Sequence, residues 1–148
     1  MLTKWDYRFL DMAKHISTWS KDPSRQIGSV AVDPIKKNIL STGYNGFPRG
    51  LIDNEERYHD RPTKYKYIVH SEMNLIYNAT FNGVSLDGCV IYVYGLPVCS
   101  ECAKGIIQVG ATRIVMDTGE IEIPDTWKES WLNTKSMLDE VGIQYEFK

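Results

Sequence analysis

The sequence predicts an α/β protein of three layers, with helices packed on a five-stranded mixed sheet. From residue 70 onward, segments of helical periodicity alternate with short apolar segments, which is typical of crossover units and a parallel sheet. Before residue 50, two short apolar segments flank a turn at Asp33 and Pro34, which predicts an antiparallel pair. These two observations together predict a mixed sheet.

The first helix is expected at residues 3–19, where Thr3 and Asp6 resemble a capping box. Its apolar residues recur at spacings of three and four: Trp5, Phe9, Met12, Ala13, Ile16 and Trp19. Strands are expected at residues 27–33 and 38–44. This part of the chain therefore contributes one helix and one hairpin.

The second half is expected to contain helices at 71–82, 100–109 and 125–141 and strands at 89–94, 112–116 and 143–147. A glycine follows each of these helices, and Asp125 is expected to cap the last one. Trp127 and Trp131 are expected in the core or an interface. Residues 64–67 alternate between lysine and tyrosine. This segment, Lys64–Tyr67, is interpreted as a strand entering the functional site rather than as a nucleic-acid contact.

Length and composition indicate one globular domain over residues 1–148. The N-terminus lacks the pattern of a secretory signal, and no apolar run approaches the roughly 18 residues of a membrane span. A cytoplasmic location without membrane association is therefore expected. The net charge of −2 and the pI of about 5.9 disfavour a polynucleotide partner and favour a small-molecule substrate.

Two motifs carry the candidate chemistry: His70-Ser71-Glu72, and the segment Pro97-Val98-Cys99-Ser100-Glu101-Cys102. One imidazole and two thiolates, from His70, Cys99 and Cys102, suit zinc and leave a fourth tetrahedral position open. A chain with three cysteines does not predict a disulfide framework, and the third, Cys89, is expected to be buried in a strand.

Both motifs are expected where helices begin, and there the helix dipole favours thiolates. Two adjacent parallel strands would bring the helix starts together at one sheet edge, where α/β proteins bind ligands. Glu72, two residues from His70, is then predicted to act as proton shuttle while a zinc-bound hydroxide attacks an amino-bearing ring carbon.

These motifs resemble the cytidine/deoxycytidylate deaminase superfamily, in which His-x-Glu pairs with Pro-Cys-x-x-Cys. The resemblance covers about residues 19–115 and is strongest to the deoxycytidylate deaminases. It includes the segments 22–28 (DPSRQIG), 43–50 (GYNGFPRG), 64–74 (KYKYIVHSEMN) and 99–104 (CSECAK). It implies a cytidine-deaminase-like fold, one catalytic Zn²⁺, and conversion of dCMP and water to dUMP and ammonia.

The resemblance also implies roles for individual residues. Asn45 would contact the deoxyribose and base, and Ser24 and Arg25 would lie near the phosphate. The backbone of Ser71, where the family usually has alanine, would read the pyrimidine edge.

Regulation and assembly follow from the same resemblance. Family members are commonly homo-oligomers, usually hexamers, activated by dCTP and inhibited by dTTP. The effector site would involve Gly43, Tyr44, Gly46 and Gly50, with Mg²⁺ accompanying a triphosphate effector.

One departure from the family pattern is Val98, which stands between Pro97 and Cys99 and could alter the pocket. Deamination of dCTP or another cytosine mononucleotide remains an alternative. A tRNA adenosine deaminase is disfavoured by the acidic pI and by the long segment between Asn45 and His70. A non-enzymatic alternative is a zinc-stabilised nucleotide-binding module, which the presence of Glu72 opposes.

Overall fold

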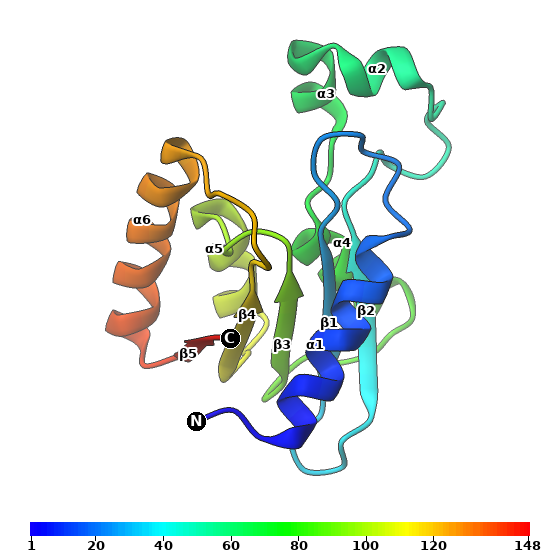
Figure 1. Cartoon of the computed structure of the whole chain (residues 1–148). Helices are drawn as coiled ribbons and strands as arrows, with labels where there is room; N and C mark the ends of the chain where they lie inside the picture. The colour runs from blue at the N-terminus through cyan, green and yellow to red at the C-terminus, as the bar shows by residue number, and fades with distance from the viewer.

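One five-stranded sheet, in the order β2-β1-β3-β4-β5, organises the computed structural model, which describes residues 1–148 (Figure 1). The strands are β1 (Gly28–Val32), β2 (Ile39–Tyr44), β3 (Val90–Tyr94), β4 (Arg113–Asp117) and β5 (Gln144–Phe147). Strand β1 pairs antiparallel with both β2 and β3, whereas β3, β4 and β5 are parallel. The predicted mixed sheet is confirmed.

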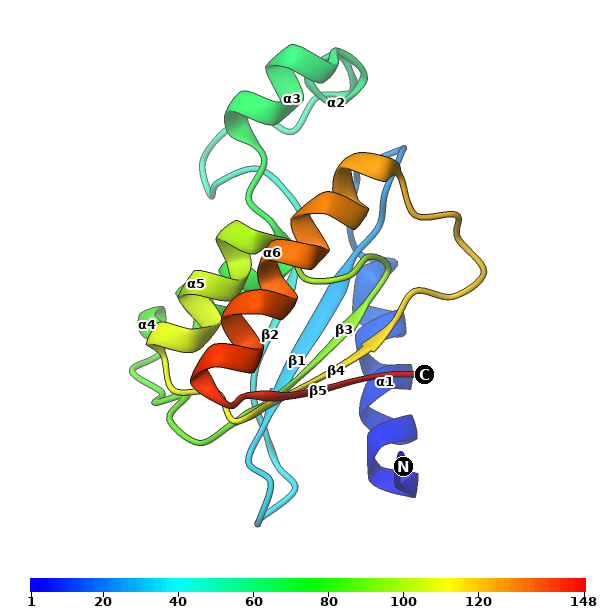
Figure 2. The same cartoon turned by 90° about the vertical axis from the view of Figure 1, so that its left-hand side faces the viewer.

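Helices cover both faces of this sheet, as predicted (Figure 2). Helix α1 (Lys4–Ser17) lies alone on one face, while α4 (Ser71–Phe81), α5 (Ser100–Gln108) and α6 (Asp125–Val141) lie on the other. Each face has its own apolar core, and strands β1, β3 and β4 contribute to both. Fully buried aliphatic side chains on both faces stabilise the sheet by removing apolar area from water. No helix is both long enough and apolar enough to span a membrane.

Helix α1 begins with the predicted capping box, in which Thr3 and Asp6 exchange hydrogen bonds between side chain and backbone. The Asp6 carboxylate also accepts hydrogen bonds from Tyr92 at 2.8 Å and from both terminal nitrogens of Arg113 at 2.8 and 3.0 Å. Burial raises the pKa of Asp6, but the hydrogen bonds from Arg113, Thr3 and Tyr92 outweigh it. The net pKa is therefore well below the usual range.

Asp6→Asn is expected to lower the free energy of unfolding at pH 7 by about 2–3 kcal/mol, because Arg113 loses its buried charged partner. An acid with a depressed pKa stabilises the fold above its unfolded pKa and loses that effect as pH falls. The difference between the variant and the parent should therefore begin to shrink below about pH 4 and disappear only near the depressed pKa of Asp6. Urea unfolding at pH 7 and pH 3 measures this. Asp11→Asn, at an exposed position of α1, is the control. If the difference in unfolding free energy between Asp6→Asn and the parent were equal at both pH values, the prediction would be wrong.

Two short helices, α2 (Glu55–His59) and α3 (Arg61–Tyr67), project beyond the sheet edge where the functional motifs lie (Figure 1). They were not predicted, and the interpretation of Lys64–Tyr67 as a strand is wrong. Pro62 fits the first turn of α3, where no intrahelical partner is needed for its missing amide. Asp125 is also not the cap of α6: Pro124 occupies the N-cap position, without a side-chain hydrogen bond.

Candidate active site

The two predicted motifs meet at one end of the sheet, because His70 is the N-cap residue of α4 and Cys99 that of α5. The preceding strands β2 and β3 run in the same direction, since both are antiparallel to β1. They are not adjacent, as β1 lies between them, so that part of the prediction is wrong. The N-termini of α4 and α5 nevertheless come together, because both helices begin at the same edge of the sheet.

Close packing of α4 on β2 sets the position of the first motif. A Cβ atom at Gly43 would lie 2.3 Å from the Ser71 carbonyl oxygen and 2.4 Å from the Leu75 nitrogen. Only glycine therefore permits this approach. The Ser71 hydroxyl lies within hydrogen-bond distance of the Ser29 hydroxyl and the Gly43 carbonyl oxygen on the strands, at 2.8 and 3.0 Å. The extra hydroxyl of Ser71 therefore links α4 to the sheet, and a substrate contact by its backbone stays a prediction.

His70, Cys99 and Cys102 form a compact cluster whose ligand atoms all lie within 4.8 Å of one another. The Nδ1 atom of His70 is 3.3 Å from the Cys99 sulfur and 3.4 Å from the Cys102 sulfur. Tetrahedral zinc, with bonds of about 2.3 Å to sulfur and 2.0 Å to nitrogen, would separate such atoms by about 3.5 Å. The donor types and their spacing therefore fit zinc, with a fourth position left for water or substrate.

One thiol of the cluster, that of Cys99, is unusually acidic. Hydrogen bonds from Cys102 and His70 lower the pKa of the Cys99 thiol to about 4, against the opposing effect of burial. The backbone amide of Cys102 also donates to the Cys99 sulfur at 3.4 Å, as expected at a helix N-terminus. The pKa of His70 is raised, mainly by its hydrogen bond to Cys99. The site therefore already favours a thiolate, the form that binds metal.

Glu72 lies in the first turn of α4 and is almost completely buried. Its Oε1 atom has no hydrogen-bond partner, and no other buried side-chain oxygen or nitrogen in the chain lacks one. Burial, reinforced by the negative charge of Cys99, raises the pKa of the Glu72 carboxyl to about 7. A buried carboxyl group that has one oxygen without a hydrogen-bond partner and a pKa near neutrality is suited to proton transfer rather than to a structural role.

The additional residue Val98 is accommodated in the core rather than in the site. Its side chain is fully buried, and its carbonyl oxygen accepts a hydrogen bond of 2.8 Å from Thr134 of α6. Because the extra residue is buried in the core and hydrogen-bonded to α6, Cys99 still caps α5 and lies beside His70.

A cavity of about 150 Å³ opens beside His70. Its lining includes three of the residues predicted to bind substrate, Ser24, Arg25 and Asn45. It also includes Trp127, whose ring centroid is 5.9 Å from that of His70 and which packs against the apolar core, as predicted. Trp131 also packs internally, against Tyr145 and Phe147.

The side chain of Asn45 is engaged with the loop that precedes β1. Its Oδ1 accepts from the Ile27 amide at 2.9 Å, and its Nδ2 donates to the Arg25 carbonyl at 2.8 Å. Asn45 therefore fixes the cavity wall that carries Ser24 and Arg25. Its predicted contact with the deoxyribose and base stays a prediction.

The residues predicted to bind an effector are only partly together. Tyr44 and Gly46 line a second cavity of about 390 Å³ between the 43–50 loop and α4, whereas Gly43 lies beneath α4 and Gly50 is exposed. None of the residues lining this cavity is acidic, so the chain provides no carboxylate there for the predicted Mg²⁺.

Comparison with known proteins defines the family. Residues 3–118 match the family described as "Cytidine and deoxycytidylate deaminase zinc-binding region". The chain belongs to this family of zinc-binding deaminases. An uncharacterised deaminase of Aliivibrio fischeri is 34% identical over 97% of this chain and 93% of its own length. A probable deoxycytidylate deaminase of Drosophila melanogaster is 36% identical over 96% of this chain and 71% of its own length.

Solved structures of deaminases share the fold. The dCMP deaminase of cyanophage S-TIM5, in complex with dCMP and dUMP, aligns with a TM-score of 0.77 over 100% of this chain and 99% of that chain, at 19% identity. The predicted cytidine-deaminase-like architecture is thereby confirmed, and the His70, Cys99 and Cys102 cluster agrees with the zinc-binding character of the family.

Proposed function

We propose that the protein deaminates dCMP hydrolytically to dUMP and ammonia. The observation that carries this proposal is the buried, unpartnered Glu72 carboxyl beside a three-ligand cluster and a small cavity. Relatives named as probable deoxycytidylate deaminases support the choice of substrate.

The reaction needs a nucleophile, a proton carrier and a held substrate. Bound by His70, Cys99 and Cys102, zinc would supply Lewis acidity that makes water nucleophilic near neutral pH. Glu72 takes a proton from water and delivers it to the ring nitrogen N3, and then transfers a second proton to the departing amino group. The water oxygen forms a bond to C4, the C4–N bond breaks, and ammonia leaves. A pKa of about 7 allows Glu72 to accept and release protons in one cycle.

Regulation forms the second part of the proposal. The cavity lined by Tyr44 and Gly46 would bind dCTP as activator and dTTP as inhibitor in a cytoplasmic homo-oligomer, expected to be a hexamer. Arg49 lines this cavity and could pair with an effector phosphate. Exposed Tyr44 and Tyr77 provide apolar surface beside it.

Ammonia release from zinc-loaded protein tests the proposed substrate. We expect dCMP to give the highest kcat/KM when compared with dCTP, deoxycytidine and a tRNA anticodon stem-loop. If dCTP were the preferred substrate, the proposed chemistry would stand, but the substrate would be dCTP rather than dCMP. If zinc-loaded, folded protein released no ammonia from any of the four, the enzymatic proposal would be wrong, and a nucleotide-binding module would be the better interpretation.

A further inference from the structure

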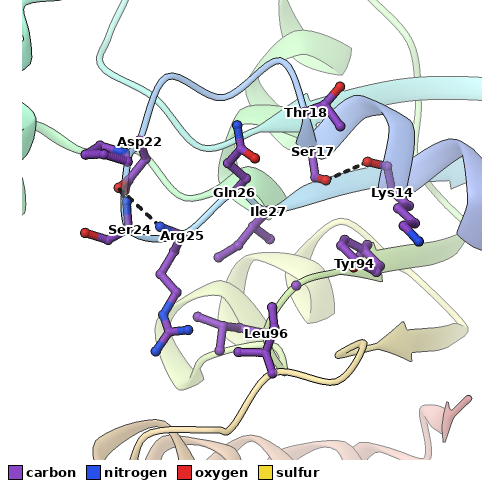
Figure 3. A pocket seen from close by; sticks show the side chains of 13 residues that line it. Lys14, Ser17, Thr18, Asp22, Ser24, Arg25, Gln26, Ile27, Tyr94 and Leu96 are labelled. Atoms are coloured by element: carbon purple, nitrogen blue, oxygen red, sulfur yellow. Dashed lines mark hydrogen bonds between the residues drawn. The ribbon is translucent and has the colours of Figure 1, made fainter.

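The cavity beside His70 is lined by both charged and apolar side chains. The charged ones come from the loop before β1 and from α3: Asp22, Arg25, Arg61 and Lys64. The apolar ones include residues next to β1 and β3 and at the start of α6: Ile27, Leu96, Pro124 and Trp127. Ile27 and Leu96 also line the neighbouring cavity of about 490 Å³, and Figure 3 shows them on the wall that the two cavities share. The cavity beside His70 therefore offers a ligand apolar surface as well as charge.

Trp127 is the aromatic side chain that lies against the ligand cluster. Its ring centroid is 5.9 Å from that of His70, and the two ring planes are inclined by 40°. The other large aromatic side chain of the lining, Tyr65, is 65% exposed on α3, and its ring lies under the ammonium group of Lys64. Trp127 therefore provides the aromatic surface next to the residues that would hold the metal.

The position of Trp127 is fixed by α6 and by the core. Its backbone amide donates to the Pro124 carbonyl at 3.0 Å, and its side chain packs against the apolar core. Helix α6 is bonded to the second motif, because the Thr134 hydroxyl donates to the Val98 carbonyl at 2.8 Å, directly before Cys99. The indole ring and the ligand cluster therefore belong to one framework, and an aromatic surface held in place in this way loses little conformational entropy when a ligand binds.

Trp131, one turn later on the same helix, has a different environment. Its ring packs against Tyr145 and Phe147 of β5, with centroid distances of 5.4 and 5.0 Å, and it does not line the cavity beside His70. Trp131 therefore serves the contact between α6 and the sheet. Trp127, whose aromatic neighbour is His70, presents an indole to the cavity.

We infer that Trp127 packs against the pyrimidine ring of the substrate and is a specificity-determining residue of this site. The inference rests on the proposed deamination of a cytosine nucleotide. Nucleobases stack on aromatic side chains, and this contact depends on the base rather than on the sugar or the phosphate. A pyrimidine that packs against Trp127 lies beside His70, where the reacting carbon has to be placed.

Trp127→Ala and Trp127→Phe test the inference, with Leu132→Ala as matched control on the same helix. Leu132 is 64% exposed and does not line the cavity. We expect Trp127→Ala to lower kcat/KM for dCMP by about 10- to 100-fold, the range of a lost base–aromatic contact. The loss should lie mainly in KM, because the contact holds the base equally before and during the reaction.

Trp127→Phe should stay within about threefold of the parent, because phenylalanine keeps an aromatic face. Leu132→Ala should match the parent. An unchanged kcat/KM in Trp127→Ala, or an equal loss in Trp127→Phe, would overturn the inference.

Calorimetric binding of dUMP and of 2-deoxyribose 5-phosphate to zinc-loaded protein separates this inference from the proposed function. Trp127→Ala should weaken dUMP binding by a similar factor and leave the binding of 2-deoxyribose 5-phosphate unchanged, because only dUMP has a base. If the parent releases no ammonia but shows this difference, the proposed reaction fails and the base contact stands. If the parent deaminates dCMP and Trp127→Ala binds dUMP as the parent does, the reaction stands and the base contact fails.

Tryptophan emission provides a readout that does not depend on how well Trp127→Ala folds. Saturating dUMP should quench the emission of the parent, because the base lies against the indole of Trp127. The same ligand should leave the emission of Trp127→Phe unchanged, although calorimetry shows that this variant binds dUMP. Quenching that persists in Trp127→Phe would show that the base does not lie against Trp127, and the inference would be wrong.

Discussion

Glu72→Gln is expected to reduce deamination by about 10²- to 10⁴-fold, the range typical of a lost general acid–base group. The amide has nearly the same shape as the carboxyl group but cannot accept a proton from water and pass it on. Since Glu72 is buried and its Oε1 has no partner, the substitution breaks no hydrogen bond of that atom. Ammonia release, zinc content by mass spectrometry and thermal unfolding should be measured on the same sample.

Glu101→Gln provides the matched control. Glu101 lies in the first turn of α5, adjacent to Cys102, but its side chain is 79% exposed and paired only with Lys104. This variant should retain parental activity and zinc content. An active Glu72→Gln protein would show that another group carries the proton. A Glu72→Gln protein that lost zinc or its fold would indicate a structural carboxylate.

The sheet, its principal helices and the ligand cluster could be predicted because each has a local signal. Helix α1 has the capping box at Thr3 and a regular apolar spacing, and both are present in the structure. The convergence of His70 with Cys99 follows from helix starts at one sheet edge. The predicted adjacency of the two strands is wrong, but the convergence holds because β2 and β3 run in the same direction on either side of β1.

The parts of the cavity wall formed by α3 and by the start of α6 could not be predicted, because their positions depend on contacts between residues distant in sequence. Helices α2 and α3 are too short for periodicity to distinguish them from strands, so the sequence of residues 64–67 does not reveal the helix found there. Lys64 becomes a buried residue only through Asp22, which is far away in the chain. Trp127 reaches His70 because α6 begins beside the cavity, a placement that depends on the whole 118–124 connection.

Cys99→Ser is expected to abolish stable zinc binding. The parent protein should retain about one zinc per chain after dialysis, and the variant less than about a tenth of this. The Cys99 thiol, with a pKa of about 4, is ionised at neutral pH, whereas a serine hydroxyl is not and is a harder donor. Turnover should fall with the zinc content, and thermal unfolding should shift to lower temperature, because metal bound only by the folded state stabilises it.

Cys89→Ala distinguishes loss of a zinc ligand from loss of any buried cysteine. Cys89 is fully buried in the core and its thiol pKa is raised to about 11 by burial, so it is a neutral apolar group outside the cluster. Its removal should cost about 1 kcal/mol of stability and leave zinc content and turnover intact. Equal zinc loss in both variants would mean that the core, rather than the cluster, controls metal retention. A Cys99→Ser protein that kept a full zinc ion would exclude His70, Cys99 and Cys102 as the ligand set.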